Sequence, residues 1–324
     1  MLWMLGGCRE PVPVTKDNFA RAESQWHFAR FVERGALGHF YHFRRLGITD
    51  QPGMRPNTDA YHSVAVFDLD AGPVTITLPE AGERFESMSI INEDNLVVGT
   101  DYTPGPHVYS KVQAGSRYVI AIVRFFTDGD VSLDSQIVHG LQDELVVQQA
   151  GPGQFDMPTY DAESQQAVRH GLRALAGSLT NWRRAAGSKQ EVDPQQHLAA
   201  TAADWGLPDE DDAQYFTGSA ATNDGSGVFQ LVLREVPADG FWSVSVCDST
   251  GHVPQGAYDQ FTINNTTAHS GPDGGIVIQF GGCDSGVDNC LPIFPGWRYT
   301  VRLYRPRPTV LDSTWTMPRL QWLR

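Results

Sequence analysis

Apolar residues at three- and four-residue steps predict three helices in this chain. The steps recur over residues 18–33, 161–187 and 193–205, as the buried face of an amphipathic helix requires. Asp17 is available as the N-cap of the first helix, and Pro194 lies in the first turn of the third. The last two helices follow one another, so together they predict a helical connection in the middle of the chain.

Alternating apolar and polar residues predict strands in two blocks, one on each side of this connection. Between the blocks, residues 131–149 fit either a short helix or an extended arm, and the acidic run 209–212 is expected to be a solvated loop. The expected organisation is a tail at 1–16, a helix and first β domain at 17–155, a helical linker at 156–212 and a second β domain at 213–324.

One pattern occurs twice, once in each β block. The pairs are Gly115/Gly296, Arg117/Arg298, Tyr118/Tyr299, Ile120/Val301, Ile122/Leu303 and Arg124/Arg305. Internal similarity of this kind indicates related structural units. We therefore predict a mainly β fold with α elements, a multidomain α+β protein in which two related antiparallel β-sandwich domains are joined by a helical segment.

Composition narrows the class of protein and its partners. The chain has 324 residues, 41% of them hydrophobic, and a formal net charge of −14. This length and apolar content suit two globular domains, whereas the negative charge disfavours nucleic acid as a partner. No stretch approaches the roughly 20 apolar residues of a membrane-spanning helix.

The first residues resemble the end of a lipoprotein signal. Leu5-Gly6-Gly7-Cys8 resembles a bacterial lipobox, in which Cys8 would carry the lipid. The basic and long apolar regions that precede such a box are absent here. Two interpretations stay open: a lipid anchor with translation starting upstream of Met1, or an ordinary N-terminus with a stray thiol.

Two cysteines lie close together in a Gly- and Asp-rich segment. Cys283 and Cys290 bracket a short loop that can return on itself and bring them within bonding distance. We predict a disulfide, which fits an oxidising compartment. A zinc site is disfavoured because no second Cys or His pair has ligand spacing.

Several segments resemble a bacterial family that joins two domains of unknown function, numbered 1254 and 1214. The clearest are Val74-Thr-Ile-Thr-Leu-Pro79, Gly240-Phe-Trp-Ser-Val-Ser-Val246, Ile278-Gln-Phe-Gly-Gly-Cys283 and Pro295-Gly-Trp-Arg-Tyr-Thr-Val-Arg-Leu-Tyr-Arg-Pro306. The likeness runs from about residue 18 to residue 315. It implies a β-rich, multidomain and often exported protein, and it carries over no activity.

Two sets of residues are candidates for chemistry. A metal or acid/base site in the first domain would use His39, His42, Asp59, His62 and Glu93, which are residue types that bind metals and transfer protons. A ligand-binding cleft would use Trp242, Tyr258, Trp297 and Arg305, because aromatic rings stack on sugars and arginine pairs with carboxylates. The alternative for the aromatic residues is the domain core.

Three functions remain open. The leading hypothesis is an exported protein of the periplasm or cell envelope that binds a small molecule or glycan in a cleft between its domains, where pockets often lie. The second is a metal-assisted or acid/base hydrolase, and the third is a structural envelope protein. The residues identify no cofactor or metal, and no nucleophile elbow, phosphate loop or dinucleotide fingerprint is present.

Overall fold

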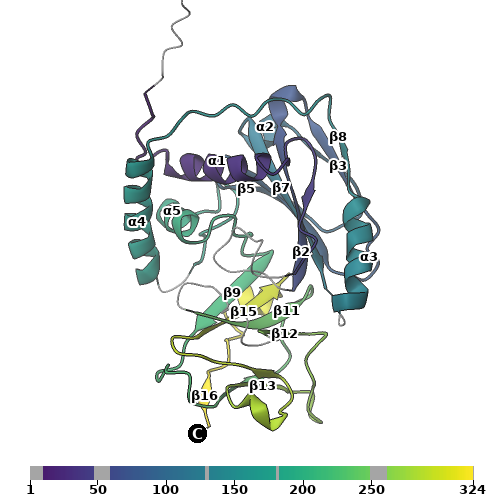
Figure 1. Cartoon of the computed structure of the whole chain (residues 1–324), viewed down its shortest axis with the longest axis vertical. Coiled ribbons are helices and arrows are strands. Elements are labelled where there is room, and N and C mark those ends of the chain that lie inside the picture. Colours follow the sequence, from purple (N-terminus) through teal and green to yellow (C-terminus); the bar gives the residue numbers. More distant parts are fainter. Residues whose placement is uncertain (1–9, 47–58, 128–130, 180–181, 249–260, 324) are drawn as a thin grey trace, which may run out of the picture.

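The computed structural model describes residues 10–46, 59–127, 131–179, 182–248 and 261–323, and it shows two β domains with helices around the first (Figure 1). The fold class predicted from the sequence is therefore confirmed as a mainly antiparallel β protein with helices. The Cys283–Cys290 disulfide is also present, with the two Cα atoms 5.5 Å apart.

The first domain packs a five-stranded sheet against a three-stranded one. In spatial order the larger sheet contains β1 (Tyr41–His42), β2 (Ala60–Asp68), β7 (Tyr118–Phe126), β4 (Glu86–Asn92) and β5 (Val97–Asp101). The smaller contains β6 (Gly105–Tyr109), β3 (Val74–Leu78) and β8 (Val146–Gln148). The short helix α2 (Lys111–Ala114) precedes β7, and α3 (Val131–Asp143) precedes β8. Residues 131–149 thus contain both a helix and a strand, where the sequence left a choice between them.

Helices cover the second face of the larger sheet. They are α1 (Phe19–Val32), α4 (Ala162–Ser178) and α5 (Pro194–Ala203), and Figure 1 shows α1 lying across the strands with α4 and α5 beside it. The Asp161 side chain caps α4 and the Asp193 side chain caps α5. The N-cap of α1 is Asn18 rather than Asp17, and the Asn18 side chain makes no capping bond.

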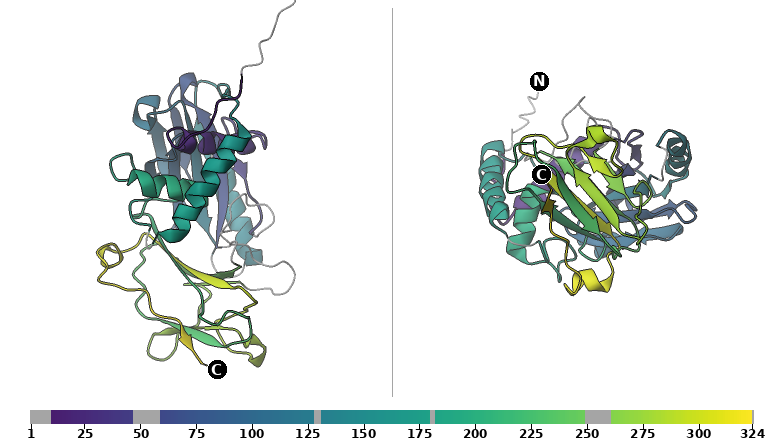
Figure 2. Two further views of the ribbon diagram at one scale, coloured as in Figure 1. Left: turned by 90° about the vertical axis from the view of Figure 1, so that its left-hand side faces the viewer. Right: turned by 90° about the horizontal axis from the view of Figure 1, so that it is seen from below.

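The second domain is a sandwich of two four-stranded sheets, seen nearly edge-on in the left view of Figure 2. One sheet contains β12 (Thr262–Asn264), β11 (Trp242–Cys247), β15 (Arg298–Tyr304) and β9 (Ala213–Gly218). The other contains β14 (Cys290–Leu291), β13 (Ile276–Phe280), β10 (Phe229–Leu233) and β16 (Gln321–Trp322). The short helix α6 (Pro308–Leu311) follows β15. In Figure 1 the sheet with β9, β15 and β11 lies on the side of the first domain.

Both copies of the repeated pattern form a central strand, β7 and β15, but the repeated residues face different layers. Ile120 and Ile122 pack under the helices of the first domain, whereas Val301 and Leu303 pack between the two sheets of the second. The difference arises because the first domain has a helical layer that the second lacks. All nine residues of β7 are consequently buried, so the strand does not have the one solvated face that alternation predicts.

The paired arginines of the repeat also differ. Arg124 lies inside β7 and is buried, with 8% exposure. Arg305 follows β15, is exposed, and stacks on Tyr102 with its guanidinium carbon 5.0 Å from the ring centre. The buried arginine of β15 is instead Arg302, at 5% exposure.

An aromatic cluster joins the two domains directly. The Phe241 ring lies 4.2 Å from that of Phe126 and 4.1 Å from that of Tyr304, and Phe85 packs beside them. Asp59 adds polar contacts across the same boundary, because its carboxylate accepts hydrogen bonds from Thr262 and Asn264. The domains therefore share a packed interface of apolar and polar contacts.

Candidate functional site

The five residues expected to form a metal or acid/base site are not brought together. The His42 ring is hydrogen-bonded to Ser63 of β2, with 2.8 Å between Nδ1 and Oγ, whereas His62 stands opposite Arg124 on β7. Neighbouring residues of a strand point to opposite faces of the sheet. His42 and His62 thus lie on opposite sides of the five-stranded sheet.

The carboxylates of this set lie at opposite ends of the sheet. Asp59 precedes β2 and contacts the second domain, whereas Glu93 follows β4 and accepts hydrogen bonds from the backbone N–H groups of Arg117 and Tyr118. Nine residues of β2 separate these ends, which is about 30 Å at the usual rise of a strand. His39 is exposed. In the described ranges, no group of three or more His, Cys, Asp or Glu residues is placed to hold a metal ion.

Two of the aromatic candidates lie in the core of the second domain. Trp297 is fully buried and Trp242 is 6% exposed, both within the core of the second domain. This location matches the alternative that the sequence left open for them. Tyr258 and Cys8 fall outside the described residues, so the ligand and lipid roles expected of them stay predictions.

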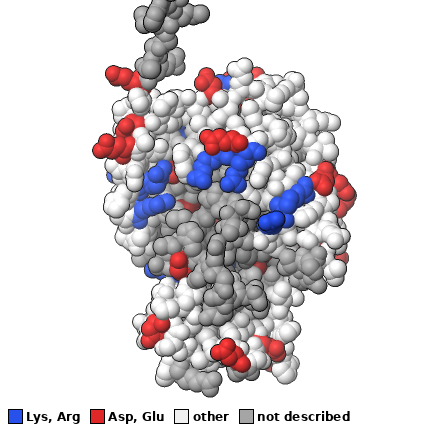
Figure 3. Space-filling view, in the orientation of Figure 1, with Lys and Arg blue, Asp and Glu red and all other residues white. Residues whose placement is uncertain are grey.

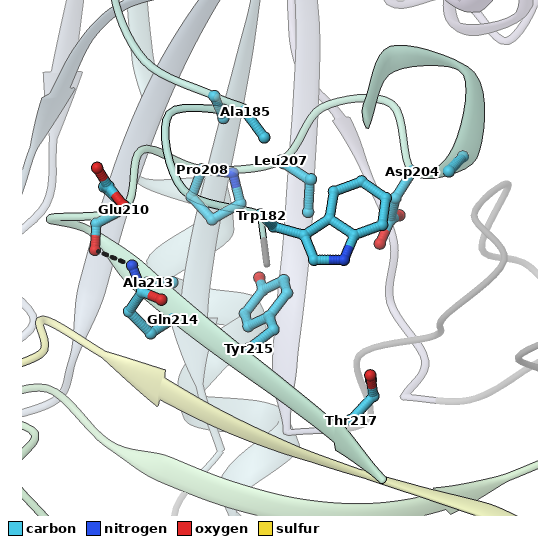
Figure 4. A pocket seen from close by; sticks show the side chains of 12 residues that line it. Trp182, Ala185, Asp204, Leu207, Pro208, Glu210, Ala213, Gln214, Tyr215 and Thr217 are labelled. Carbon is cyan, nitrogen blue, oxygen red and sulfur yellow. Dashed lines mark hydrogen bonds between the residues drawn. The ribbon is translucent and has the colours of Figure 1, made fainter. Parts of the chain in front are cut away.

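A pocket lies between the helical linker and strand β9, and Figure 4 shows its lining. The centres of water molecules can occupy a volume of about 80 Å³ in it. By the same measure one water molecule needs roughly 10–15 Å³. The lining residues are Trp182, Ala185, Ala186, Ala203, Asp204, Leu207, Pro208, Glu210, Ala213, Gln214, Tyr215 and Thr217. We call this site the linker pocket. Its mixture of aromatic, aliphatic and polar side chains is typical of sites for small molecules.

The linker wall of the pocket is anchored on the first domain. Trp205 follows α5 and stacks on His27 of α1, with 4.3 Å between the ring centres. Its indole N–H donates a hydrogen bond to the hydroxyl of Ser24. His197 of α5 has ring nitrogens 3.0 Å from the carbonyl oxygen of Ala185 and 2.9 Å from that of Asp94. The opposite wall is β9 of the second domain, so a molecule in the pocket would contact structure held by both domains.

Two side chains dominate the centre of the linker pocket. In Figure 4 the Trp182 indole and the Tyr215 ring lie close to one another, with Leu207 beside them. Trp182 keeps 37% of its surface exposed, which is unusual for the largest aromatic side chain and leaves its ring available for stacking. The Tyr215 hydroxyl lies 3.4 Å from the Tyr304 hydroxyl, which connects the pocket with the interface between the domains.

The acidic run beside the pocket is more enclosed than the expected solvated loop. Burial, reinforced by the nearby charges of Glu191 and Asp212, raises the pKa of Asp209 to about 6. Asp212 accepts a hydrogen bond from the Tyr102 hydroxyl of the first domain, with 2.5 Å between the oxygens. Asp209 and Asp212 thus place carboxylates on both sides of Glu210, which lines the pocket.

The sequence provided no signal for this pocket. Trp182 lies within the helix predicted over residues 161–187, although it follows α4 in the structure, and Tyr215 begins the second β block. Nothing in their spacing links them. Only the packing of the linker against both domains brings them together.

Charged residues on the surface show no broad basic area on the face drawn in Figure 3. Basic side chains there stand beside acidic ones, and the visible part of the second domain carries acidic side chains. Among the described helices, none is long and apolar enough to cross a membrane.

Two β-sandwiches and a helical linker with a small pocket beside it define a multidomain β-rich protein. Two family models match parts of this chain. Residues 37–95 match the DUF1254 model and residues 212–308 match the DUF1214 model, both described as proteins of unknown function. The two models match in the N- to C-terminal order of the tandem family that the sequence resembles.

Solved structures support the same fold. The VPA0106 protein from Vibrio parahaemolyticus is similar with a TM-score of 0.70 and 13% identity, over 96% of this chain and 100% of that one. An uncharacterised protein from Burkholderia cenocepacia has a TM-score of 0.52 and 12% identity, over 95% of this chain and 87% of its own. At these identities the likeness shows the fold alone. A comparison with curated proteins finds no match.

Proposed function

We propose that this protein binds a small molecule or glycan in the linker pocket. The observation that carries the proposal is the composition of the two walls: one is fixed to the first domain through Trp205 and His197, and the other is β9 of the second. A ligand there gains contacts with both domains at once. The exposed Trp182 ring beside Tyr215 supports a ligand with a flat or apolar face, such as a sugar ring or an aromatic group.

A pocket with polar and aromatic lining favours binding over a purely structural role. The hydrolase hypothesis has less support, because the described structure separates His42 from His62 and Asp59 from Glu93. The pocket itself contains the carboxylates of Asp204 and Glu210, without a histidine or a cysteine among its lining residues.

The test is a thermal-shift screen of the full chain against glycans and small organic acids. A ligand present at 100 times its Kd should stabilise the folded protein by about 2.7 kcal/mol. Trp182→Ala should weaken the binding of any stabilising compound at least tenfold, since stacking on an aromatic ring is lost. Trp322→Ala is the matched control, because Trp322 is 70% exposed on the far sheet of the second domain. Equal binding by both variants, or silence across a broad library, would contradict the proposal.

We also propose that the protein works in an oxidising compartment such as the periplasm. The Cys283–Cys290 disulfide supports this location, because such bonds persist where thiols are not kept reduced. Thiol labelling of freshly extracted native protein should leave both cysteines unmodified. Labelling of both would contradict the proposed location.

A further inference from the structure

Each domain buries one arginine in its central strand. Arg124 of β7 donates from Nη1 to the hydroxyl of Ser89 at 3.1 Å, and Arg302 of β15 donates from Nη1 to the hydroxyl of Ser245 at 2.7 Å. They are 8% and 5% exposed. Across the ranges that the structure describes, neither guanidinium has a carboxylate partner within ion-pair distance. A buried cation without a counter-ion destabilises a fold. An anion bound beside these two arginines would therefore stabilise the folded protein.

The two arginines stand on the faces by which the domains meet. Alternate residues of a strand share a face, so Arg124 lies on the same face as Phe126, and Arg302 on the same face as Tyr304. Phe126 and Tyr304 both pack on the Phe241 ring, at 4.2 and 4.1 Å. The arginines therefore flank one aromatic contact, one from each domain.

Both guanidinium groups also act on one hydroxyl. Burial raises the pKa of Tyr304 well above its usual value, and the charges of Arg302 and Arg124 both oppose that rise. Tyr215 is the partner of this hydroxyl, and the Arg302 guanidinium carbon lies 5.8 Å from the centre of its ring. Both cations thus act on the Tyr304 hydroxyl, and its partner Tyr215 lines the linker pocket.

Buried polar atoms without partners line the same two strand faces. Ser243 stands directly opposite Arg302 and is fully buried, and its Oγ has no hydrogen-bond partner in the described structure. His62 stands opposite Arg124, and its buried Nδ1 is likewise unpartnered. Buried polar groups are nearly always satisfied in native proteins. Thr100, opposite Ser89, has an unpartnered Oγ1 as well. A ligand that accepts hydrogen bonds would explain why an unsatisfied hydroxyl lies near each of the two guanidinium groups.

We propose that Arg124 and Arg302 clamp an oxyanion, a carboxylate or phosphate group, between the two domains. A guanidinium presents a planar set of donors that matches the oxygens of either group, and the hydroxyl of Ser243 supplies a further donor. The inference rests on the proposed function, because the anion would be the charged end of the molecule whose body occupies the linker pocket beside Tyr215. The net charge of −14 means that contacts at the site, rather than the overall field of the protein, select the anion.

The experiment compares the full-length wild type with Arg124→Met and Arg302→Met. Methionine removes the charge and keeps an apolar stem in the core. Arg298→Met is the matched control, because Arg298 is an exposed residue of β15 on the same face as Arg302. Each protein is titrated by thermal shift with succinate and, separately, with inorganic phosphate, against sodium chloride of equal ionic strength.

We expect wild type and Arg298→Met to be stabilised alike by one of the two anions, which then identifies the oxyanion. Both core variants should fold without loss of thermal stability in the absence of anion, because an unpaired buried charge has been removed. Their apparent affinity for the anion should fall at least about tenfold, as is usual when a charged hydrogen-bond partner is lost. Ser243→Ala should fold like wild type and bind the anion several-fold more weakly.

Other outcomes would overturn the clamp. The first is an equal anion response in the wild type and in all three arginine variants. The second is the absence of any response to either anion. The third is strong destabilisation of Arg124→Met and Arg302→Met together with wild-type anion binding by Ser243→Ala. If neutral compounds stabilise the wild type in a Trp182-dependent manner while no anion does, the clamp fails and the proposed function stands. If neither kind of compound binds, both fail.

Discussion

Glu86 is a buried carboxyl group whose removal should stabilise the protein at neutral and alkaline pH. It begins β4 opposite Phe125 of β7 and is 4% exposed. Its Oε2 has no hydrogen-bond partner among the described residues. Burial, with a smaller contribution from the charge of Glu80, raises the pKa of Glu86 from 4.5 to about 7.

The sign of the pH dependence follows from this direction. The folded protein holds the proton more tightly than the unfolded chain, so the full contribution of Glu86 to stability is present below pH 4.5 and declines as the pH rises to 7. Each unit of pKa difference corresponds to about 1.4 kcal/mol. The rise from 4.5 to about 7 therefore costs about 3 kcal/mol above pH 7.

Glu86→Gln keeps the shape of the side chain and cannot ionise. Its free energy of unfolding should match that of the wild type near pH 4.5 and exceed it by about 3 kcal/mol at pH 8. For one cooperative transition of a chain of this length, that difference is a rise in Tm of roughly 4–5 °C. Urea denaturation of both proteins at pH 4.5, 6 and 8 measures the effect. Glu80→Gln, at an exposed neighbouring position, is the control and should change stability by less than about 1 kcal/mol. A difference between Glu86→Gln and wild type that is the same at all three pH values would refute the reasoning.

Two further predictions concern the helical layer and the domain boundary. Burial and the charges of Arg30 and Arg169 lower the pKa of His27 from 6.5 to about 3, so its neutral form stabilises the fold above pH 6.5 and that stability is lost as the pH falls. His27→Gln should reduce the loss of unfolding free energy between pH 7.5 and 5 by up to about 2 kcal/mol; an unchanged loss in urea titrations would disprove this. Phe241→Ala should destabilise the protein by about 3–5 kcal/mol and split the calorimetric transition in two, because its ring joins the domains; a single transition at an unchanged Tm would count against that role.

Local chemistry made much of the fold predictable. Asp161 and Asp193 cap α4 and α5, because a short oxygen-bearing side chain satisfies the first backbone N–H groups of a helix wherever that helix lies. The seven-residue separation of Cys283 and Cys290 likewise brought their side chains together without help from distant residues.

The candidate site was less predictable, because it depends on which sheet face each residue occupies and what covers that face. His42 and His62 share one segment of the chain, yet β1 pairs with β2 so that they lie on opposite sides of the sheet. The repeat drew attention to Arg305, which is exposed. The buried arginine of β15 is Arg302, three positions earlier in the sequence.

Residue order alone was enough for the two β blocks, the helical linker, the disulfide and the family, because each depends on short-range periodicity, capping or spacing. Tertiary structure was needed for the helical layer that covers the second face of β7, and for the linker pocket. It was also needed to place Arg124 and Arg302, one from each domain, where both act on Tyr304. These features arise from contacts between residues that are 33 positions apart, as in Trp182 and Tyr215, to 178 positions apart, as in Arg124 and Arg302. Over such separations no local pattern records which side chains will face each other.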